Sequence, residues 1–275
     1  MDYLHYLRKE KMPHIWCDGC GHGIILKSIL RVIDKLGWDK NDVAVVSGIG
    51  CSSRTPGYVD FNTLHTTHGR AIAFSTGLKI ANPRLHVIVV TGDGDATAIG
   101  GNHFIHAARR NIELSVIIFN NSIYGMTGGQ VSPTTPTSKK ATTAPYGNPD
   151  APFNISELAV AAGASFVARI TAYHVYKMDQ LIEHALTKRG FSVVEVLSPC
   201  PTSYGRKNKE GRGADMLRLQ KELAITIEKA KTATAEELQG KIITGVLVDR
   251  EAVTYLERYE QMRQNALLSK TKLTE

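Results

Sequence analysis

Short runs that are apolar at nearly every position alternate along this chain with segments whose apolar residues recur at helical spacing. The runs include "VAVV", "VIVV", "VIIF" and, with one glutamate, "VVEVL". A strand that is apolar on both sides must be covered on both faces, and a parallel sheet with crossover helices gives that environment. We therefore predict an α/β fold, a mostly parallel sheet with helices on both faces that finishes at Ser198.

After about residue 206 the sequence becomes rich in charged residues and in residues of high helix propensity. We expect residues 1–205 to form the main, ligand-binding domain. Residues 206–275 are predicted to be a C-terminal helical extension, packed on that domain or on a partner subunit. A chain of 275 residues with 43% hydrophobic content is long enough to bury one large core.

The net charge of +7 is compatible with nucleic acid or with an acidic protein as a partner. The basic residues are not interleaved with aromatic ones, as single-strand binders require, so we expect no nucleic acid partner. The N-terminal text "MDYLHYLRKEKMPHIWC" is charged and amphipathic and reads neither as a signal peptide nor as a membrane span. A cytoplasmic protein without a membrane partner is the expectation.

Four of the expected strands end in turns with chemically distinctive residues. The carboxyl ends of parallel strands meet at one edge of a sheet, which is where ligands collect in such folds. We therefore expect these turns to lie together around a ligand. They are Gly48-Ile49-Gly50-Cys51, Gly92-Asp93-Gly94-Asp95, Asn120-Asn121 and Pro199-Cys200.

The Gly92-Asp93-Gly94 turn lacks the third glycine of a dinucleotide fingerprint and places an acid where a pyrophosphate would approach. An aspartate beside a diphosphate is tolerable when a divalent cation lies between them, and magnesium prefers such oxygen ligands. Asn121 follows Asp93 by 28 positions, enough for one crossover helix and the next strand. The spacing predicts a magnesium diphosphate site, with a turn-stabilising aspartate as the alternative reading of Asp93.

A G-D-G turn followed by paired asparagines at this spacing is the thiamine diphosphate signature. Together with "WCDGCGHG", "GIGCSSRTPGY", "LHTTHGRAIAFSTGLK", "NNSIYGMTGGQ" and "SPCPTSYGRKNK", it resembles the β subunit of 2-oxoacid:ferredoxin oxidoreductases over roughly residues 12–210. The resemblance implies that thiamine diphosphate binds through magnesium. The metal ligands that it implies are the side chains of Asp93 and Asn121 and the backbone carbonyl of Ile123.

The four cysteines are Cys17, Cys20, Cys51 and Cys200, of which the first two form a C-x-x-C motif between glycines. From the residues alone, a structural zinc site and an iron-sulfur cluster are both open. A thioredoxin-like pair would leave Cys51 and Cys200 unexplained. The resemblance implies one [4Fe-4S] cluster held by all four.

Other site residues follow from the resemblance. The stretch after Asn121 would pass under the thiazolium ring, and the Ser-, Thr- and Pro-rich residues 122–154 would cover the site and limit water. His65, His68 and Arg54 are the candidates for catalytic contact with the diphosphate or the substrate. His22 is a similar candidate, and for each of these four a purely structural role is the alternative. The remaining cofactor-binding candidates are Gly92, Gly94, Tyr124, Gly125, Met126 and Thr127.

The reaction implied is the reversible oxidative decarboxylation of a 2-oxoacid to its acyl-coenzyme A, with electrons passed to ferredoxin. "CPTSYGRKNK" resembles the 2-oxoglutarate enzymes, which would form succinyl-CoA and CO2. Pyruvate and branched-chain substrates stay open. A non-redox thiamine diphosphate decarboxylase or synthase would not need four coordinated thiolates, and a zinc protein that binds nucleic acid would not need the magnesium site.

The resemblance also implies a partner. It places the glutamate that activates the aminopyrimidine on an α subunit with the pyrimidine-binding domain, and we expect a dimer of heterodimers. Basic residues near the expected cluster suit the steering of an acidic ferredoxin, although an ordinary charged surface is the alternative. These residues are Arg8, Lys9, Lys11, Arg206, Lys207, Lys209 and Arg212.

Overall fold

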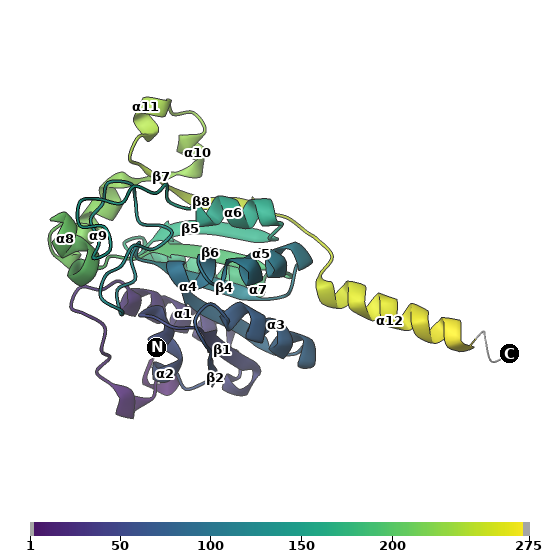
Figure 1. Ribbon diagram of the computed structural model, residues 1–275. Coiled ribbons are helices and arrows are strands. Elements are labelled where there is room, and N and C mark those ends of the chain that lie inside the picture. The colour runs from purple at the N-terminus through teal and green to yellow at the C-terminus, as the bar shows by residue number, and fades with distance from the viewer. Residues whose placement is uncertain (1–2, 272–275) are drawn as a thin grey trace.

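The computed structural model describes residues 3–271, in which strands and helices alternate along most of the chain (Figure 1). The strands are β1 (Val43–Ser47), β2 (Asn62–His65), β3 (His86–Gly92), β4 (Ser115–Asn120), β5 (Phe166–Thr171), β6 (Ser192–Leu197), β7 (Ala224–Thr226) and β8 (Ile242–Asp249). The helices are α1 (His22–Leu36), α2 (Thr55–Tyr58), α3 (Ala71–Ala81), α4 (Asp93–Thr97), α5 (Gly101–Arg110), α6 (Ile155–Ala162), α7 (Val175–Thr187), α8 (Arg206–Asn208), α9 (Gly213–Leu223), α10 (Ile227–Ala230), α11 (Ala235–Leu238) and α12 (Tyr255–Thr271).

Within residues 3–271 the strands form one sheet in the order β2-β1-β3-β4-β6-β5-β8-β7. Every pairing from β2 to β5 is parallel, and β8 lies antiparallel to β5. The predicted fold class, a mostly parallel sheet, is confirmed. The expectation that the sheet finishes at Ser198 is wrong, because β8 and the short β7 extend it from the C-terminal part. β8 is only half-buried and pairs on one edge of the sheet, so its sequence lacks the fully apolar pattern of the central strands.

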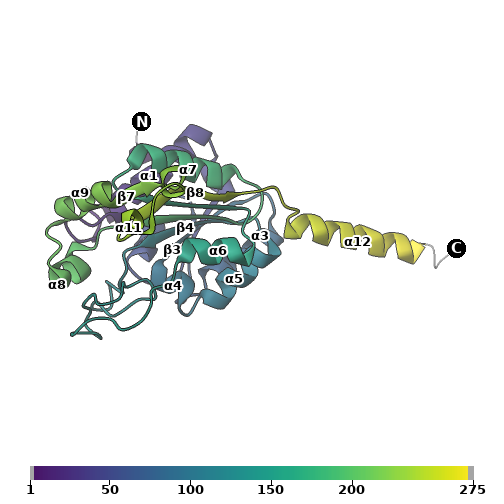
Figure 2. The ribbon, with the colours of Figure 1, turned by 90° about the horizontal axis from the view of Figure 1, so that it is seen from above.

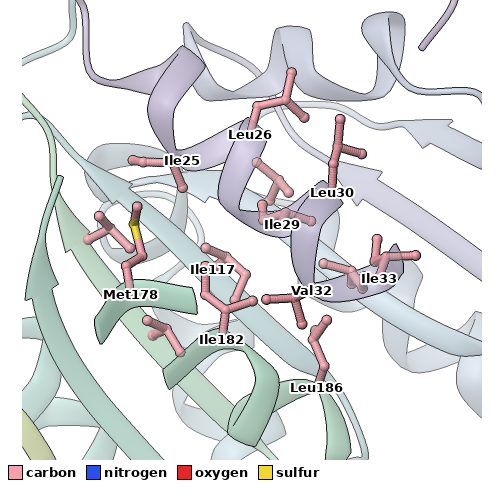
Figure 3. Packing of buried hydrophobic residues seen from close by; sticks show 14 of the residues in the cluster. Ile25, Leu26, Ile29, Leu30, Val32, Ile33, Ile117, Met178, Ile182 and Leu186 are labelled. Carbon is pink, nitrogen blue, oxygen red and sulfur yellow. The ribbon is translucent and has the colours of Figure 1, made fainter. Parts of the chain in front are cut away.

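Helices cover both faces of the sheet, as the apolar runs predict. Val45 and Ile117 belong to the cluster under α1 and α7, whereas their neighbours Val46 and Ile118 belong to the cluster under α3, α5 and α6. Successive strand residues point to opposite faces, so a strand covered on both faces is apolar at most of its positions. Figure 3 shows the first cluster, in which Ile29 of α1 packs near Ile117 and the α7 side chains.

The ends of α1 show how the sequence sets these elements. Gly21 precedes the helix, and Gly37 ends it in the left-handed conformation with φ of +63°. Glycine adopts this conformation without a steric cost, so it is the common helix terminator. The predicted terminator at Gly37 is confirmed. The C-x-x-C motif therefore lies in the loop that enters α1, at the carboxyl edge of the sheet.

The C-terminal part has two regions. Residues 206–249 lie against the sheet through α9 and β8, whereas α12 extends away from the body of the molecule in both views (Figures 1 and 2). The predicted helical extension is thus present, interrupted by β7 and β8. None of the helices in the described residues is both long and apolar enough to span a bilayer. The division of the chain at residue 205 stays a prediction.

Candidate active site

The strand ends that carry the distinctive turns are neighbours in the sheet. β1, β3, β4 and β6 lie side by side and parallel, so the residues that follow them emerge at the same edge. Cys51, Asp93, Asn121 and Cys200 follow these four strands in turn. The sequence therefore predicted correctly that these turns lie on one edge.

A cavity of about 250 Å³ opens at this edge, between the ends of β1, β3 and β4. Most of the expected cofactor-binding residues line it. The predicted residues in its wall are His22, Cys51, His68, Gly92, Asp93, Gly94, Asn121, Ile123, Tyr124, Gly125, Met126 and Thr127. Ile49, Gly50 and Asp95 also line the cavity and come from the turns that were expected to lie around a ligand. Ser52 and Phe119 are the lining residues that the sequence reasoning did not nominate.

Three oxygen atoms in the cavity wall lie close together with no hydrogen-bond donor among them, in the orientation that the structure gives the Asn121 amide. The side-chain oxygen of Asn121, as placed, faces the carbonyl of Ile123 at 2.9 Å and Asp93 Oδ1 at 3.2 Å. Adjacent ligands of an octahedral magnesium ion at its usual bond length lie about 2.9 Å apart, so this donor set fits the ion. Rotating the amide by half a turn would instead let its nitrogen donate to both oxygens. The residues present thus fit the predicted magnesium ligands.

The second oxygen of Asp93 is held by the loop that covers the site. Ser132 and Thr134 donate hydrogen bonds to Asp93 Oδ2 at 2.5 and 2.6 Å, so Oδ1 is left to face Asn121. Burial raises the pKa of Asp93, although these hydrogen bonds act in the opposite direction. A buried carboxylate in this position is stabilised by a cation. The sequence predicted that this loop covers the site, but it did not identify Ser132 and Thr134. The loop contains many serine and threonine residues, and the sequence does not show which of their hydroxyls contact Asp93.

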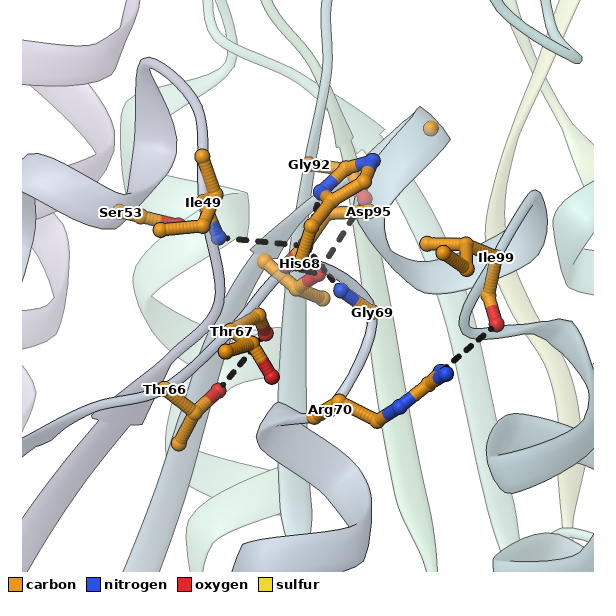
Figure 4. Close-up of polar contacts among 12 residues, drawn as sticks. Ile49, Ser53, Thr66, Thr67, His68, Gly69, Arg70, Gly92, Asp95 and Ile99 are labelled. Carbon is orange, nitrogen blue, oxygen red and sulfur yellow. Dashed lines mark hydrogen bonds and ion pairs between the residues drawn. The ribbon is translucent and has the colours of Figure 1, made fainter.

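Asp95 joins three segments beneath the cavity (Figure 4). Its carboxylate accepts hydrogen bonds from the backbone amides of Ile49 and Gly69 at 3.2 and 2.7 Å and from the Thr91 hydroxyl at 2.7 Å. His68 Nδ1 lies 2.7 Å from the same carboxylate, although its ring N–H is not aligned as a hydrogen bond. Asp95 thereby holds the loop that places His68 in the cavity wall.

Gly94 is required by the close approach of Tyr124. A β-carbon at position 94 would lie 2.4 Å from two ring carbons of Tyr124, whereas one at Gly92 would come no nearer than 3.4 Å to Ser52 Oγ. We expect Gly94→Ala to lower the free energy of unfolding by about 1–3 kcal/mol through overpacking. Gly92 has an extended backbone that alanine also adopts, so Gly92→Ala should change it by less than about 1 kcal/mol. Denaturant unfolding of both variants checks this, and equal effects would contradict it.

Ser52 and His22 are two further residues of the cavity wall whose side chains have polar atoms. Ser52 is buried, and its hydroxyl has no hydrogen-bond partner within the described residues, which leaves it available to a ligand in the cavity. His22 is buried against Trp16 and Phe119, and its Nδ1 lies 3.0 Å from Ser198 Oγ. Burial lowers the pKa of His22 to about 3, so its imidazole is neutral.

The structure places Arg54 and His65 differently from His68. Arg54 is exposed, and its guanidinium lies 3.9 Å from the sulfur of Met126 at the edge of the cavity. His65 is exposed at the end of β2 and is not part of the cavity wall in the described residues. Their contact with substrate or diphosphate stays a prediction.

The four cysteine thiols lie near one another beside Gly125. A β-carbon on Gly125, which itself lines the cavity, would lie 3.3 Å from Cys51 Sγ and 3.7 Å from Cys200 Sγ. The amide of Gly21 donates to the carbonyl of Pro199 at 3.3 Å, which joins the C-x-x-C loop to the Cys200 turn. Trp16 Nε1 donates to the carbonyl of Cys51 at 2.6 Å and joins the same loop to β1.

The electrostatics of this thiol group, Cys17, Cys20, Cys51 and Cys200, call for a cationic partner. Burial is the main cause that raises the pKa of Cys20 to about 12 and of Cys51 to about 11, and the neighbouring cysteines add to both increases. Burial also raises the pKa of Cys200. The thiols of Cys20, Cys51 and Cys200 would therefore lose their protons only when a metal compensates the charge. No three His, Cys, Asp or Glu side chains within residues 3–271 are grouped as ligands of one metal ion. A [4Fe-4S] cluster binds one thiolate at each of its four iron atoms, so its ligands need not converge on one point and the donor set fits it.

Comparisons with known proteins agree with the site. The family "Thiamine pyrophosphate enzyme, C-terminal TPP binding domain" matches residues 48–196. The chain is 52% identical to the 2-oxoglutarate synthase subunit KorB of Methanocaldococcus jannaschii over 94% of this chain and 96% of that protein. It is 56% identical to KorB of Methanothermobacter marburgensis, over 90% of this chain and 87% of that protein.

A solved structure supports the same relationship. The 2-oxoglutarate:ferredoxin oxidoreductase from Magnetococcus marinus, with 2-oxoglutarate, coenzyme A and succinyl-CoA bound, matches with a TM-score of 0.86 and 36% sequence identity. The match covers 97% of this chain and 91% of that chain. This chain therefore belongs to the β-subunit family of the thiamine diphosphate-dependent 2-oxoacid:ferredoxin oxidoreductases.

Proposed function

We propose that this chain is the catalytic β subunit of a 2-oxoglutarate:ferredoxin oxidoreductase that binds magnesium, thiamine diphosphate and one [4Fe-4S] cluster. The complex would convert 2-oxoglutarate and coenzyme A reversibly to succinyl-CoA and CO2 and pass the electrons to ferredoxin. The observation that carries this proposal is that Gly125, which lines the cofactor cavity, lies beside both groups of ligands. A β-carbon at Gly125 would be 3.3 Å from Cys51 Sγ, 3.7 Å from Cys200 Sγ and 3.7 Å from Asn121 Nδ2. Both cofactors would then lie within a short electron-transfer distance.

Thiamine diphosphate, when bound, supplies the electron sink on which a 2-oxoacid loses CO2. The chain's own residues would bind, orient and cover it. Asp93, Asn121 and the Ile123 carbonyl would hold the magnesium ion, and the unpaired Ser52 hydroxyl and His68 are placed to contact the cofactor or substrate. Residues 122–154 would exclude water, since Ser132 and Thr134 tie this loop to Asp93.

The four thiols would hold the cluster as Cys17, Cys20, Cys51 and Cys200. The alternative is a structural zinc site with the same ligands. The position of the thiols beside the cofactor cavity favours the cluster, because a structural zinc ion has no need to be near a reacting substrate. The same reasoning disfavours a non-redox thiamine diphosphate decarboxylase or synthase.

The assembly is proposed from the relatives and from what the cavity lacks. The β-subunit names of the relatives imply a partner subunit, and no glutamate is among the residues that line the described cavity. We infer that an α subunit supplies the pyrimidine-binding domain and the activating glutamate, in a dimer of heterodimers. Exposed basic residues near the thiols, such as Arg206 and Lys207, suit an acidic ferredoxin. The cytoplasmic location, the absence of nucleic acid and membrane partners, and the domain division at residue 205 stay predictions.

Substrate preference gives the test of this function. The relatives named above support 2-oxoglutarate over pyruvate and branched-chain 2-oxoacids. A site that binds the second carboxylate leaves polar groups unpaired when that carboxylate is missing, so we expect kcat/KM for 2-oxoglutarate to exceed that for pyruvate by at least about 100-fold. The measurement is coenzyme A-dependent ferredoxin reduction by the anaerobically purified complex. Equal rates with pyruvate would overturn the substrate, and CO2 release without ferredoxin reduction would overturn the redox function.

A further inference from the structure

The turn that carries the expected magnesium ligands contains a residue in an unfavourable conformation. Ser122 lies between Asn121 and Ile123 and has a left-handed backbone with φ of +56°. A residue with a β-carbon is uncommon in this conformation and needs support from its surroundings. The conformation matters because it turns the chain so that the Asn121 side chain and the Ile123 carbonyl face the same point.

Asn120 supplies that support. Its side-chain oxygen accepts a hydrogen bond from the Ser122 backbone amide at 3.0 Å and lies 3.0 Å from the Thr134 hydroxyl. Asparagine side chains commonly stabilise turns by accepting from the amide two residues ahead. The Thr135 hydroxyl holds the other side of the turn, since it donates to the Ser122 carbonyl at 2.7 Å.

Glu195 fixes which end of the Asn120 amide faces the turn. Asn120 Nδ2 donates to Glu195 Oε1 at 2.7 Å, so the amide oxygen must point the other way, toward Ser122. Glu195 lies in the middle of β6 and is only 2% exposed. Its second oxygen accepts from Ser156 at 2.5 Å and from Arg169 Nε at 2.9 Å.

A buried carboxylate with an arginine is a costly way to fill a sheet interior. Such a pair gains little over apolar residues of the same size, because both charges must lose their hydration. The group formed by Arg169, Ser156, Glu195 and Asn120 brings residues of β5, α6, β6 and β4 together on one amide. The specific effect of this group is to orient the Asn120 amide, which apolar side chains in the same place would not do.

We propose that Asn120 and Glu195 are positioning residues for the magnesium site. Glu195 sets the orientation of the Asn120 amide, and Asn120 stabilises the left-handed Ser122, so that Asn121 and the Ile123 carbonyl face one ion before any cofactor binds. This inference deepens the proposed function and rests on it. Neither residue touches the cofactor cavity through the atoms that form these hydrogen bonds.

A loss and a rescue test the role of Asn120. Asn120→Ala should raise the Mg²⁺ concentration for half-maximal thiamine diphosphate binding by about 10- to 100-fold, as changes behind metal ligands do. Ser122→Gly should restore it to within about threefold of the wild-type value in the same chain, because glycine adopts the left-handed conformation without support. Ser122→Gly alone is the matched control and should leave the value unchanged. The measurement is calorimetric titration of the complex at several Mg²⁺ concentrations. An unchanged Asn120→Ala variant, or one that Ser122→Gly does not restore, would overturn the proposal.

A second pair of variants tests Glu195. Glu195→Gln should raise the same Mg²⁺ concentration by about 10-fold. Asp179→Asn is the control, because Asp179 also binds a serine and an arginine, Ser28 and Arg31, but on the α1–α7 face. It should leave the Mg²⁺ requirement within about twofold of wild type, whatever it does to the melting temperature. Equal Mg²⁺ shifts in the two variants would overturn the role of Glu195, and if Glu195→Gln does not fold, the Asn120 variants decide.

Amide hydrogen exchange in the cofactor-free complex separates this inference from the proposed function. The Ser122 amide should exchange at least about 10-fold faster in Asn120→Ala and Glu195→Gln than in wild type and Asp179→Asn, because its acceptor is lost or turned away. If wild-type complex binds no thiamine diphosphate with Mg²⁺, the proposed function fails while this exchange still reports on the turn. Unchanged exchange at Ser122 would overturn the positioning role.

Discussion

Replacing Asp93 with alanine should weaken Mg²⁺-dependent thiamine diphosphate binding by more than about 100-fold. Changes to residues behind a metal ligand already cost 10- to 100-fold in affinity, so loss of a direct ligand should exceed that range. Asp93 Oδ1 faces Asn121 and its Oδ2 is held by Ser132 and Thr134. Asp95, the other carboxylate that lines the cavity in the described residues, is held by hydrogen bonds of its own and is not arranged to replace Asp93. The measurement is calorimetric titration with thiamine diphosphate at fixed Mg²⁺.

The control for Asp93 is Asp150→Asn in the exposed part of the covering loop, which should bind the cofactor as wild type does. Iron content and visible absorbance of Asp93→Ala should match the wild-type values, because Asp93 is held by Ser132 and Thr134 and the four cysteines are unchanged. Simultaneous loss of the cofactor and of the cluster would mean that Asp93 is needed for folding, and it would contradict a ligand role.

Replacing Cys200 with alanine should have the opposite pattern. The cluster needs four thiolates, and Cys200 is buried beside Cys51 and Gly125, so the variant should lose most of its iron, sulfide and visible absorbance. Ferredoxin reduction should fall by more than about 100-fold, since electrons would have no carrier between substrate and ferredoxin. Thiamine diphosphate binding should persist, because Asp93, Asn121 and Ile123 are unchanged.

Thr202→Ala is the matched control, because Thr202 is exposed in the same turn. It should keep both iron and activity. A Cys200→Ala variant that retains iron and reduces ferredoxin normally would contradict the cluster. A colourless wild-type protein with one zinc ion per chain would support the structural zinc alternative.

The central part of the fold could be predicted because its strands are buried on both faces. "VIVV" and "VIIF" are apolar at every position, and the sheet places both in its centre. β2 and β8 lie near the edges and mix polar with apolar residues, so their sequences carry a weaker pattern. β7 has only three residues and lies between helices. The surrounding sequence has helical character, so the extension of the sheet was not predicted.

The cavity could be predicted where residues are close to a strand end. Asp93, Asn121 and Tyr124 follow β3 and β4 directly, so the sheet order alone brings them together. Ser132, Glu195 and Asp95 act through contacts that only the three-dimensional structure reveals. Ser132 lies in a loop without regular structure and contacts Asp93, which is 39 residues earlier in the chain. Glu195 contacts Asn120 from a neighbouring strand. No local sequence pattern indicates contacts between residues so far apart in the chain.

The account depends on one arrangement, in which a magnesium-held cofactor and an iron-sulfur cluster both lie beside Gly125 in this chain. The most direct test is the visible absorbance of the anaerobically purified complex before and after substrate is added. We expect a brown wild-type complex whose absorbance bleaches when 2-oxoglutarate and coenzyme A are added together. The Cys200→Ala complex should show no such change. A wild-type complex that binds thiamine diphosphate but has no iron, or whose absorbance does not respond to substrate, would contradict the account.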